Sequence, residues 1–274
     1  MAAPCVIELR ANVFARGEHV PSSVDEIVAD AIAAAGAGAA IVHWHASSDV
    51  AICRRLRRDT DLLLHPTLGA AREQDFAARE RRVASLAGHA DLVPVDFGCV
   101  NLDLWSRETG RFRTEDRTYV NARGDIRGLL EAVAANGLSV AAGCWSVGHV
   151  RTAARFAAMG LLDGALWQLV FTGNPLPDGM APTRAGLEAM VEQVPSGRPW
   201  SVLCIGGDAF ELAKWAIEGG GHVSMGLGDW PYRDLGAPTN TELVARVAAL
   251  AKAAGRPAAS PADCRAILEG RCTV

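Results

Sequence analysis

Two histidines one residue apart are the sharpest chemical signal in this chain. His43 and His45 end the apolar segment AAIVHWH at residues 39–45. Side chains alternate across a β-strand, so both imidazoles would point to the same face. Two neutral imidazoles on one face can share a divalent metal ion. The alternative is a pair of histidines held by hydrogen bonds, with no metal between them.

The third metal ligand has three candidates. Asp229 follows the last strand-like run, His65 ends the third run, and His149 follows the fifth run within SVGH at 146–149. Each of them could be a ligand, a general base or only part of a loop. A carboxylate can both neutralise the charge of a metal and accept a substrate proton. We therefore expect Asp229 to be the catalytic residue, and His65 or Asp229 to complete the metal site.

Other residues that follow strand-like runs are expected to bind substrate. They are Thr67, Cys99, Asn101, Gly173 and Gly206. Gly206 begins a glycine pair between the seventh run and a helix, and backbone amides at such a junction can hold phosphate. Gly173 lies in a turn-rich segment after the sixth run. Cys99 has no basic residue beside it, so we do not expect it to act as a nucleophile.

The elements that would position these residues alternate along the whole chain. Short apolar runs alternate with longer, alanine-rich stretches, which is the pattern of parallel βα units. The strand-like runs are residues 6–10, 39–45, 62–65, 92–97, 138–143, 164–171, 200–205 and 222–226. The expected helices are residues 24–34, 51–57, 73–87, 125–135, 150–159, 184–194, 209–218, 242–254 and 261–268.

The count of strands and helices predicts an α/β fold, namely a single (β/α)8 TIM barrel over residues 1–274 with extra C-terminal helices. The chain has 274 residues, and such a barrel needs about 250. The rival is an open doubly wound sheet, but no GxGxxG motif follows the first strand. Residues 98–121 are too long for an ordinary βα loop, so we expect a lid or a subunit contact there. Ser22-Ser23 before Glu26 resembles a capping box, and Pro261 suits the first position of a helix.

Composition excludes several classes of partner. The chain has 27 basic and 31 acidic residues, a formal net charge of −4, so we expect neither nucleic acid nor an anionic membrane as partner. No apolar run reaches the roughly 18–20 residues of a membrane helix, and no secretory signal is readable. The seven cysteines are scattered without a CxxC pair, which is typical of reduced thiols. These features predict a cytoplasmic protein.

Taken together and in order, several segments resemble the β-keto acid cleavage enzymes, a family that includes the 3-keto-5-aminohexanoate cleavage enzyme of lysine fermentation. The similar segments are VDEI at 24–27, GAAIVHWH at 38–45, DFGCVN at 96–101, SVGH at 146–149, WSVLCIG at 200–206, GHVSMGLGD at 221–229, TNTELV at 239–244 and GRPAASPA at 255–262. The resemblance therefore runs almost from end to end of the chain.

The resemblance implies a zinc-dependent barrel that converts a β-keto acid and acetyl-CoA into acetoacetate and a new acyl-CoA. In this family the HxH pair and a glutamate after strand eight bind zinc, and the ion polarises the keto oxygen. The next residue, an aspartate, is the acid/base group, assisted by an arginine and by a glutamate on strand five. His43, His45 and Asp229 carry over directly. The resemblance also implies a homo-oligomer.

Three of the family's charged positions do not carry over. The zinc glutamate aligns with Gly228, the arginine aligns with Ser224, and the strand-five glutamate falls near Gly143 or Ala141. Glycine has no side chain with which to bind a metal, and serine cannot anchor a carboxylate as a guanidinium does. Either Asp229 or His65 completes the metal site, or tight metal binding has been lost.

Our leading interpretation is a divergent metal-dependent transferase of this family, with CoA entering along the loops near Gly173 and Gly206. Two alternatives stay open. One is a metal-dependent hydrolase on a TIM barrel, in which an HxH pair and a strand-eight aspartate hold a metal that activates water. The other is a non-catalytic family member that has lost the zinc glutamate.

Overall fold

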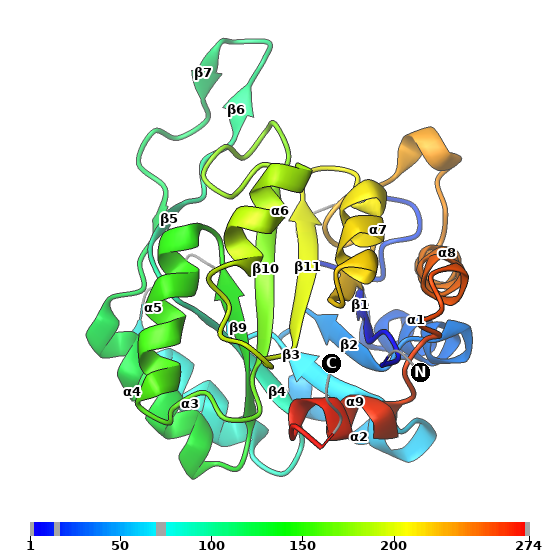
Figure 1. The fold of residues 1–274 in the computed structure, drawn as a ribbon, viewed down its shortest axis with the longest axis horizontal. Coiled ribbons are helices and arrows are strands. Elements are labelled where there is room, and N and C mark those ends of the chain that lie inside the picture. The colour runs from blue at the N-terminus through cyan, green and yellow to red at the C-terminus, as the bar shows by residue number, and fades with distance from the viewer. Residues whose placement is uncertain (1–2, 14–16, 70–74, 272–274) are drawn as a thin grey trace.

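A ring of parallel strands forms the centre of the molecule (Figure 1). The computed structural model describes residues 3–13, 17–69 and 75–271. The barrel strands are β1 (Ile7–Arg10), β2 (Ile41–Trp44), β3 (Leu63–Pro66), β4 (Leu92–Asp96), β9 (Ser139–Cys144), β10 (Leu166–Thr172), β11 (Trp200–Ile205) and β12 (His222–Met225). They pair in the order β3-β2-β1-β12-β11-β10-β9-β4, and every pairing is parallel.

The two end strands of this order, β3 and β4, meet and nearly close the barrel. The amide of Asp91, just before β4, donates to the carbonyl of Leu64 at 2.9 Å. The amide of Leu64 donates to Oδ2 of Asp91 at 2.7 Å. An open doubly wound sheet would leave its end strands apart, so the predicted TIM barrel is confirmed.

Helices surround the strands on the outside. The described residues form nine α-helices: α1 (Val24–Ala37), α2 (Asp49–Asp59), α3 (Phe76–Leu86), α4 (Arg123–Ala135), α5 (Val147–Ala158), α6 (Arg184–Val191), α7 (Phe210–Glu218), α8 (Asn240–Ala253) and α9 (Pro261–Leu268). Ser23 and Glu26 form the predicted capping box at α1, and Pro261 lies at the start of α9 as predicted. The predicted beginning of the third helix, at residue 73, lies outside the described residues. None of the described helices is both long and apolar enough to span a membrane.

The last helix seals one end of the barrel. α9 packs its apolar residues, such as Ile267, against the beginnings of strands, including Ile41 and Leu92. In Figure 1 this red helix lies under the strands, at the end opposite their carboxyl termini. The apolar contacts between α9 and the strands close the amino-terminal end of the barrel. The cavity described below therefore opens at the other end, where the strands have their carboxyl termini.

The predicted excursion at 98–121 rises above the carboxyl ends of the strands (Figure 1). It contains two short antiparallel ladders, β5 (Val100–Asn101) with β8 (Thr118–Tyr119) and β6 (Trp105–Ser106) with β7 (Arg111–Phe112). The rings of Trp105 and Phe112 meet edge to face at its tip, 5.1 Å between centroids. A lid or a subunit contact remains a prediction for this segment.

Candidate active site

A large cavity of about 1580 Å³ opens at the carboxyl ends of the strands. This is the end of a TIM barrel at which active sites are built. Six of the residues proposed from sequence line it: His43, His45, His65, Thr67, Gly206 and Asp229. Because inward side chains alternate along each strand, the residues of β1 that face this interior are Glu8 and Arg10. Both are almost fully buried.

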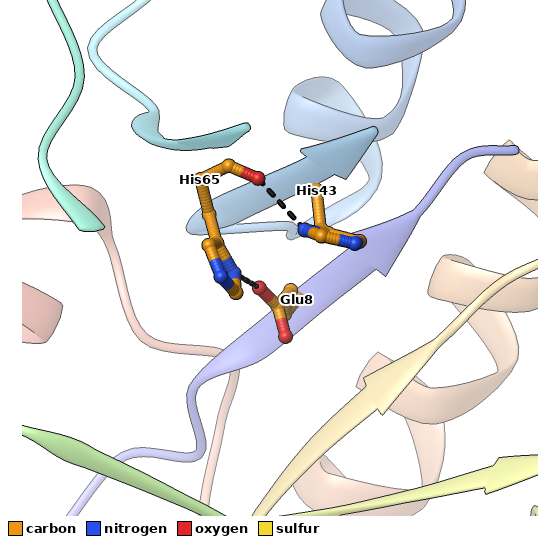
Figure 2. A group of neighbouring side chains, drawn as sticks. All are labelled: Glu8, His43 and His65. Carbon is orange, nitrogen blue, oxygen red and sulfur yellow. Dashed lines mark hydrogen bonds and ion pairs between the residues drawn. The ribbon is translucent and has the colours of Figure 1, made fainter. Parts of the chain in front are cut away.

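Three potential metal ligands gather on neighbouring strands below the mouth. Glu8 on β1, His43 on β2 and His65 on β3 each offer one ligand atom, and these atoms all lie within 4.8 Å of one another. Figure 2 shows the two imidazoles and the carboxylate converging from these strands. His45 follows β2, and its ring lies 5.1 Å from that of His43 between centroids. It therefore borders this cluster from the side of the mouth.

Hydrogen bonds fix which nitrogen of each imidazole is available. Nδ1 of His43 donates to the carbonyl oxygen of His65 at 2.8 Å, since a carbonyl can only accept. Nδ1 of His65 likewise donates to Oε1 of Glu8 at 2.6 Å. In the neutral form of an imidazole that donates through Nδ1, the lone pair is on Nε2. Nε2 of His65 is buried with no hydrogen-bond partner among the described residues. Such second-shell bonds orient metal-binding histidines.

The charge states in this cluster suit a cation. Burial lowers the pKa of His43 well below its usual range, with a further contribution from Arg10, so this imidazole is neutral. Burial alone would raise the pKa of Glu8. However, the charge and hydrogen bond of His65, together with Arg10 and Ser224, outweigh burial and hold that pKa below its ordinary value. The neutral imidazole of His43 beside the ionised carboxylate of Glu8 provides donors of the kind that a divalent metal requires.

The other oxygen of Glu8 is held by residues on β12, the strand next to β1, and on β10. Oε2 accepts hydrogen bonds from Oγ of Ser224 on β12 and from Nε2 of Gln168 on β10. Gln168 also donates to Ser224 at 3.3 Å. This carboxylate is therefore fixed between the histidines and β12. The residues present fit a metal: two imidazole nitrogens with available lone pairs, and a carboxylate that can bind the ion or orient His65.

A second pair of charges lies beside this cluster. Nε of Arg10 donates to Oδ2 of Asp229 at 2.6 Å, and the two side chains are only 7% and 3% exposed. Oδ1 of Asp229 is buried without a hydrogen-bond partner among the described residues. Burial raises the pKa of Asp229 to about 6, against the opposing effect of Arg10. A carboxylate with a pKa near neutrality and one unpartnered oxygen is suited to exchanging a proton with a ligand in the cavity.

The structure explains why position 228 has no side chain. A Cβ at Gly228 would lie closer than 3.0 Å to the amides of Val13 and Asn12 and to the carbonyl of Arg10. These are backbone atoms after β1, which cannot yield as a flexible side chain would. β1 and β12 approach each other so closely here that only glycine fits.

Position 143 is also occupied by a neighbour. A Cβ at Gly143 on β9 would collide with the carboxylate of Asp96, which is its register partner on β4. Asp96 lines the cavity and accepts a hydrogen bond from Nε1 of Trp145 at 2.7 Å. Burial raises its pKa, while hydrogen bonds from Trp145 and Tyr119 oppose this effect. A carboxylate thus stands where the strand-five glutamate of the resemblance would have placed one.

The remaining proposed residues have different surroundings. Cys99 is exposed, and its Sγ accepts a hydrogen bond from the amide of Asn121 at 3.4 Å. Asn101 is also exposed and donates to Asp178 at 3.1 Å. Neither they nor Gly173 are among the described residues that line the cavity.

The backbones of Gly173 and Gly206 lie close together. A Cβ at Gly173 would meet the carbonyl of Gly206 at less than 3.0 Å. The glycine at 173 therefore allows the two loops to approach, while Gly206 lies at the cavity wall.

Sequence reasoning missed Glu8 and Arg10. The available signal was a glutamate and an arginine at alternate positions in VIELR, an otherwise apolar first strand. Charged side chains are almost never fully buried unless they are paired. Two of them on the inner face of β1 therefore required partners inside the barrel.

Comparison with known proteins agrees with this geometry. The 3-keto-5-aminohexanoate cleavage enzyme of Fusobacterium nucleatum is 28% identical over 263 residues, which are 91% of this chain and 90% of that protein. The 3-oxoadipate:acetyl-CoA acetyltransferase of Cupriavidus necator is 27% identical over 281 residues, 98% of this chain and 95% of that protein.

Among solved structures, an N-acetylmannosamine-6-phosphate 2-epimerase from Clostridium perfringens superimposes with a TM-score of 0.55 at 16% identity, over 84% of this chain and 90% of that one, a likeness of fold alone. The family described as beta-keto acid cleavage enzyme matches residues 11–269. With a barrel whose mouth gathers imidazoles and carboxylates, and a family match over most of its length, the chain belongs to the beta-keto acid cleavage enzymes.

Proposed function

We propose that this enzyme transfers the acyl unit of a β-keto acid to CoA in a metal-dependent exchange with acetyl-CoA. The products are acetoacetate and a new acyl-CoA. The observation that carries the proposal is the cluster of Glu8, His43 and His65 below the mouth of the barrel, with His43, His65 and Asp229 lining the cavity. The relative from Cupriavidus necator is a 3-oxoadipate:acetyl-CoA acetyltransferase, which supports acetyl-CoA as the second substrate.

The metal would be held by the imidazoles of His43 and His65, with Glu8 as the carboxylate of the site and His45 at its edge. Imidazole and carboxylate donors suit zinc. When bound, the ion supplies a Lewis acid that polarises the keto oxygen of the substrate. Gln168 and Ser224 keep Glu8 in place through their hydrogen bonds to its Oε2.

Asp229 would exchange the proton of the reaction. Its Oδ1 takes a proton from C2 of the β-keto acid, while Arg10 holds Oδ2 at 2.6 Å. C2 then bonds to the acetyl carbon, and CoA leaves as a thiolate. The thiolate attacks the original keto carbon, the bond from that carbon to C2 breaks, and C2 recovers the proton from Asp229. Atoms and charge balance, because the proton returns to C2 and the thiolate becomes part of the new acyl-CoA.

The alternatives have less support. A hydrolase would require a metal-activated water, and the relatives that cover most of the chain are named as cleavage enzymes and acetyl-CoA transferases. A non-catalytic barrel would have no need to keep Arg10 and Asp229 paired and buried at the mouth, because buried ion pairs are a poor source of stability.

Metal content and turnover test the proposal together. Protein purified without added metal should carry near-stoichiometric zinc by elemental mass spectrometry, and His43→Ala should lose it. Wild type should form acetoacetate from a panel of β-keto acids only when acetyl-CoA is present. His89→Ala is the matched control, because His89 is a histidine outside the described lining of the cavity. A wild type that binds no zinc and shows no acetyl-CoA-dependent turnover would refute the proposed function.

A further inference from the structure

A groove of about 510 Å³ is lined by residues of α4 and α5. Figure 1 shows these two helices on the outside of the barrel. Four arginines give it its character: Arg123 and Arg127 on α4, and Arg151 and Arg155 on α5. Gly148, Thr152, Phe156 and Met159 complete the lining. All four arginines are exposed, and the lining contains no acidic residue.

The positive charge of this groove is uncompensated within the described chain. None of the four guanidinium groups forms an ion pair or a hydrogen bond with another described residue. On each helix the two arginines are four positions apart, where like charges repel. Arg123 is also the first residue of α4, where the helix dipole is positive, and Ala122 before it provides no side-chain cap. A groove of this kind attracts an anion.

The position of the groove connects it to the active site. Trp145 lines the large cavity, and Gly148, the third residue after it, lines the groove. The turn from β9 to α5 is therefore the rim between the two. α4 and α5 both begin at this end of the barrel, because each follows the carboxyl end of a strand or the excursion above it. A long ligand can enter the cavity with one end and reach the arginines with the other.

We propose that this groove, rather than the loops near Gly173 and Gly206, binds the phosphate groups of the CoA thioester whose acyl end reacts in the cavity. This inference rests on the proposed function. CoA carries a pyrophosphate and a 3′-phosphate at one end, its thioester at the other, and a long pantetheine arm between them. Guanidinium groups bind phosphate oxygens in pairs of parallel hydrogen bonds, and four of them match several phosphates. Met159, which is 55% exposed, offers an apolar surface for the adenine.

Charge reversal on one wall of the groove tests the inference. The variant Arg151→Glu/Arg155→Glu should bind CoA at least tenfold more weakly than wild type in isothermal titration calorimetry at low salt. Its KM for acetyl-CoA should rise by a similar factor, with the KM for the β-keto acid within twofold of wild type. The matched control is Arg54→Glu/Lys252→Glu, which changes the net charge equally on α2 and α8 at exposed positions. It should bind CoA like wild type.

The binding measurement separates this inference from the proposed function. The variant His43→Ala, which removes a proposed metal ligand, should still bind CoA, because the groove does not depend on the metal site. Wild-type affinity for CoA in Arg151→Glu/Arg155→Glu would overturn the inference even if turnover were normal. Light scattering compares the oligomeric state of the variant with that of wild type. An oligomer that wild type forms and the variant does not would also overturn the inference, since the groove would then hold a second copy of the chain. ADP should compete with CoA for wild type but not for the variant.

Discussion

Removal of Arg10 is the perturbation that most directly probes the chemistry of the site. In Arg10→Met the guanidinium is lost, while a side chain of similar length still fills the space beside Asp229. The wild-type ion pair is nearly buried, at 7% and 3% exposure, and its atoms lie 2.6 Å apart. Breaking a buried pair leaves an uncompensated charge and costs about 3–5 kcal/mol. Asp229 escapes part of this cost by binding a proton.

The sign of the pH dependence follows from that proton. Burial already raises the pKa of Asp229 to about 6, and loss of Arg10 raises it further. At pH 5 the carboxyl group is mostly protonated in both proteins, so the loss of stability is small. Above pH 8 Asp229 must be charged without its partner, and the loss of stability should reach about 3 kcal/mol. The acidic limb of kcat/KM should move to higher pH for the same reason.

Urea unfolding at pH 5 and pH 8 measures the effect on stability, and a pH–rate profile with a β-keto acid and acetyl-CoA measures the effect on activity. The double variant Arg10→Met/Asp229→Asn is the control. It removes both charges and should recover most of the stability at pH 8. An equal loss of stability at both pH values, with an unmoved acidic limb, would show that Arg10 and Asp229 are not coupled as the structure implies.

Two further changes test the packing around the site. Asp30 accepts a hydrogen bond from Asn240 at 2.7 Å, and burial raises its pKa from 3.8 to about 6. The charged form of Asp30 lowers the stability of the folded protein above that pH. In the same unfolding assay, Asp30→Asn should therefore stabilise the protein by about 1–2 kcal/mol at pH 7.5, a value reduced for the partial exposure of the side chain. Below pH 4 it should have no effect on stability. A gain that persists at pH 3.5 would contradict this cause. Gly228→Ala should lower the free energy of unfolding by about 3 kcal/mol or more, because its Cβ would meet the backbone of Val13; wild-type stability would show that β1 can move away.

The fold was accessible from sequence because its signals are local. Each strand appears as a short apolar run, and the helix starts at Ser23 and Pro261 depend only on residues within one turn. Closure of the barrel was inferred from the number of βα units, and the contacts between Leu64 and Asp91 confirm it. The ladders within residues 98–121 were not predicted, because strands of two residues have no readable periodicity.

The site was accessible only in part because its contacts are not local. His43, His45 and Asp229 were identified from a spacing and a strand end. The partner of Glu8 lies 57 positions away, and that of Arg10 lies 219 positions away. The sequence contains no local signal that β1 pairs with β12, yet this pairing brings Arg10 next to Asp229. The two residues were therefore passed over as ordinary members of an apolar strand.

Two of the three positions at which the sequence departs from the resemblance, 143 and 224, have a common explanation in the barrel. Inward side chains of adjacent parallel strands lie at similar levels, so a charged group can move to the neighbouring strand and keep its place in the cavity. Asp96 pairs with Gly143. Glu8 pairs with Ser224 and not with Gly228, so its carboxylate lies deeper in the barrel than position 228. Arg10, two residues further along β1, provides the guanidinium beside Asp229.

Space at the vacated positions is consistent with this relocation. Gly228 and Gly143 have no room for a Cβ, because the neighbouring strand or its side chain already fills the volume. The carboxylate of Asp96 fills the space beside Gly143, and the backbone of β1 and of the residues after it fills the space beside Gly228. The sequence lacks three charged residues that the resemblance implies, while Asp96 and Arg10 line the cavity and Glu8 lies in the cluster beneath it. The arrangement therefore supports our proposal of an active enzyme with a modified pocket.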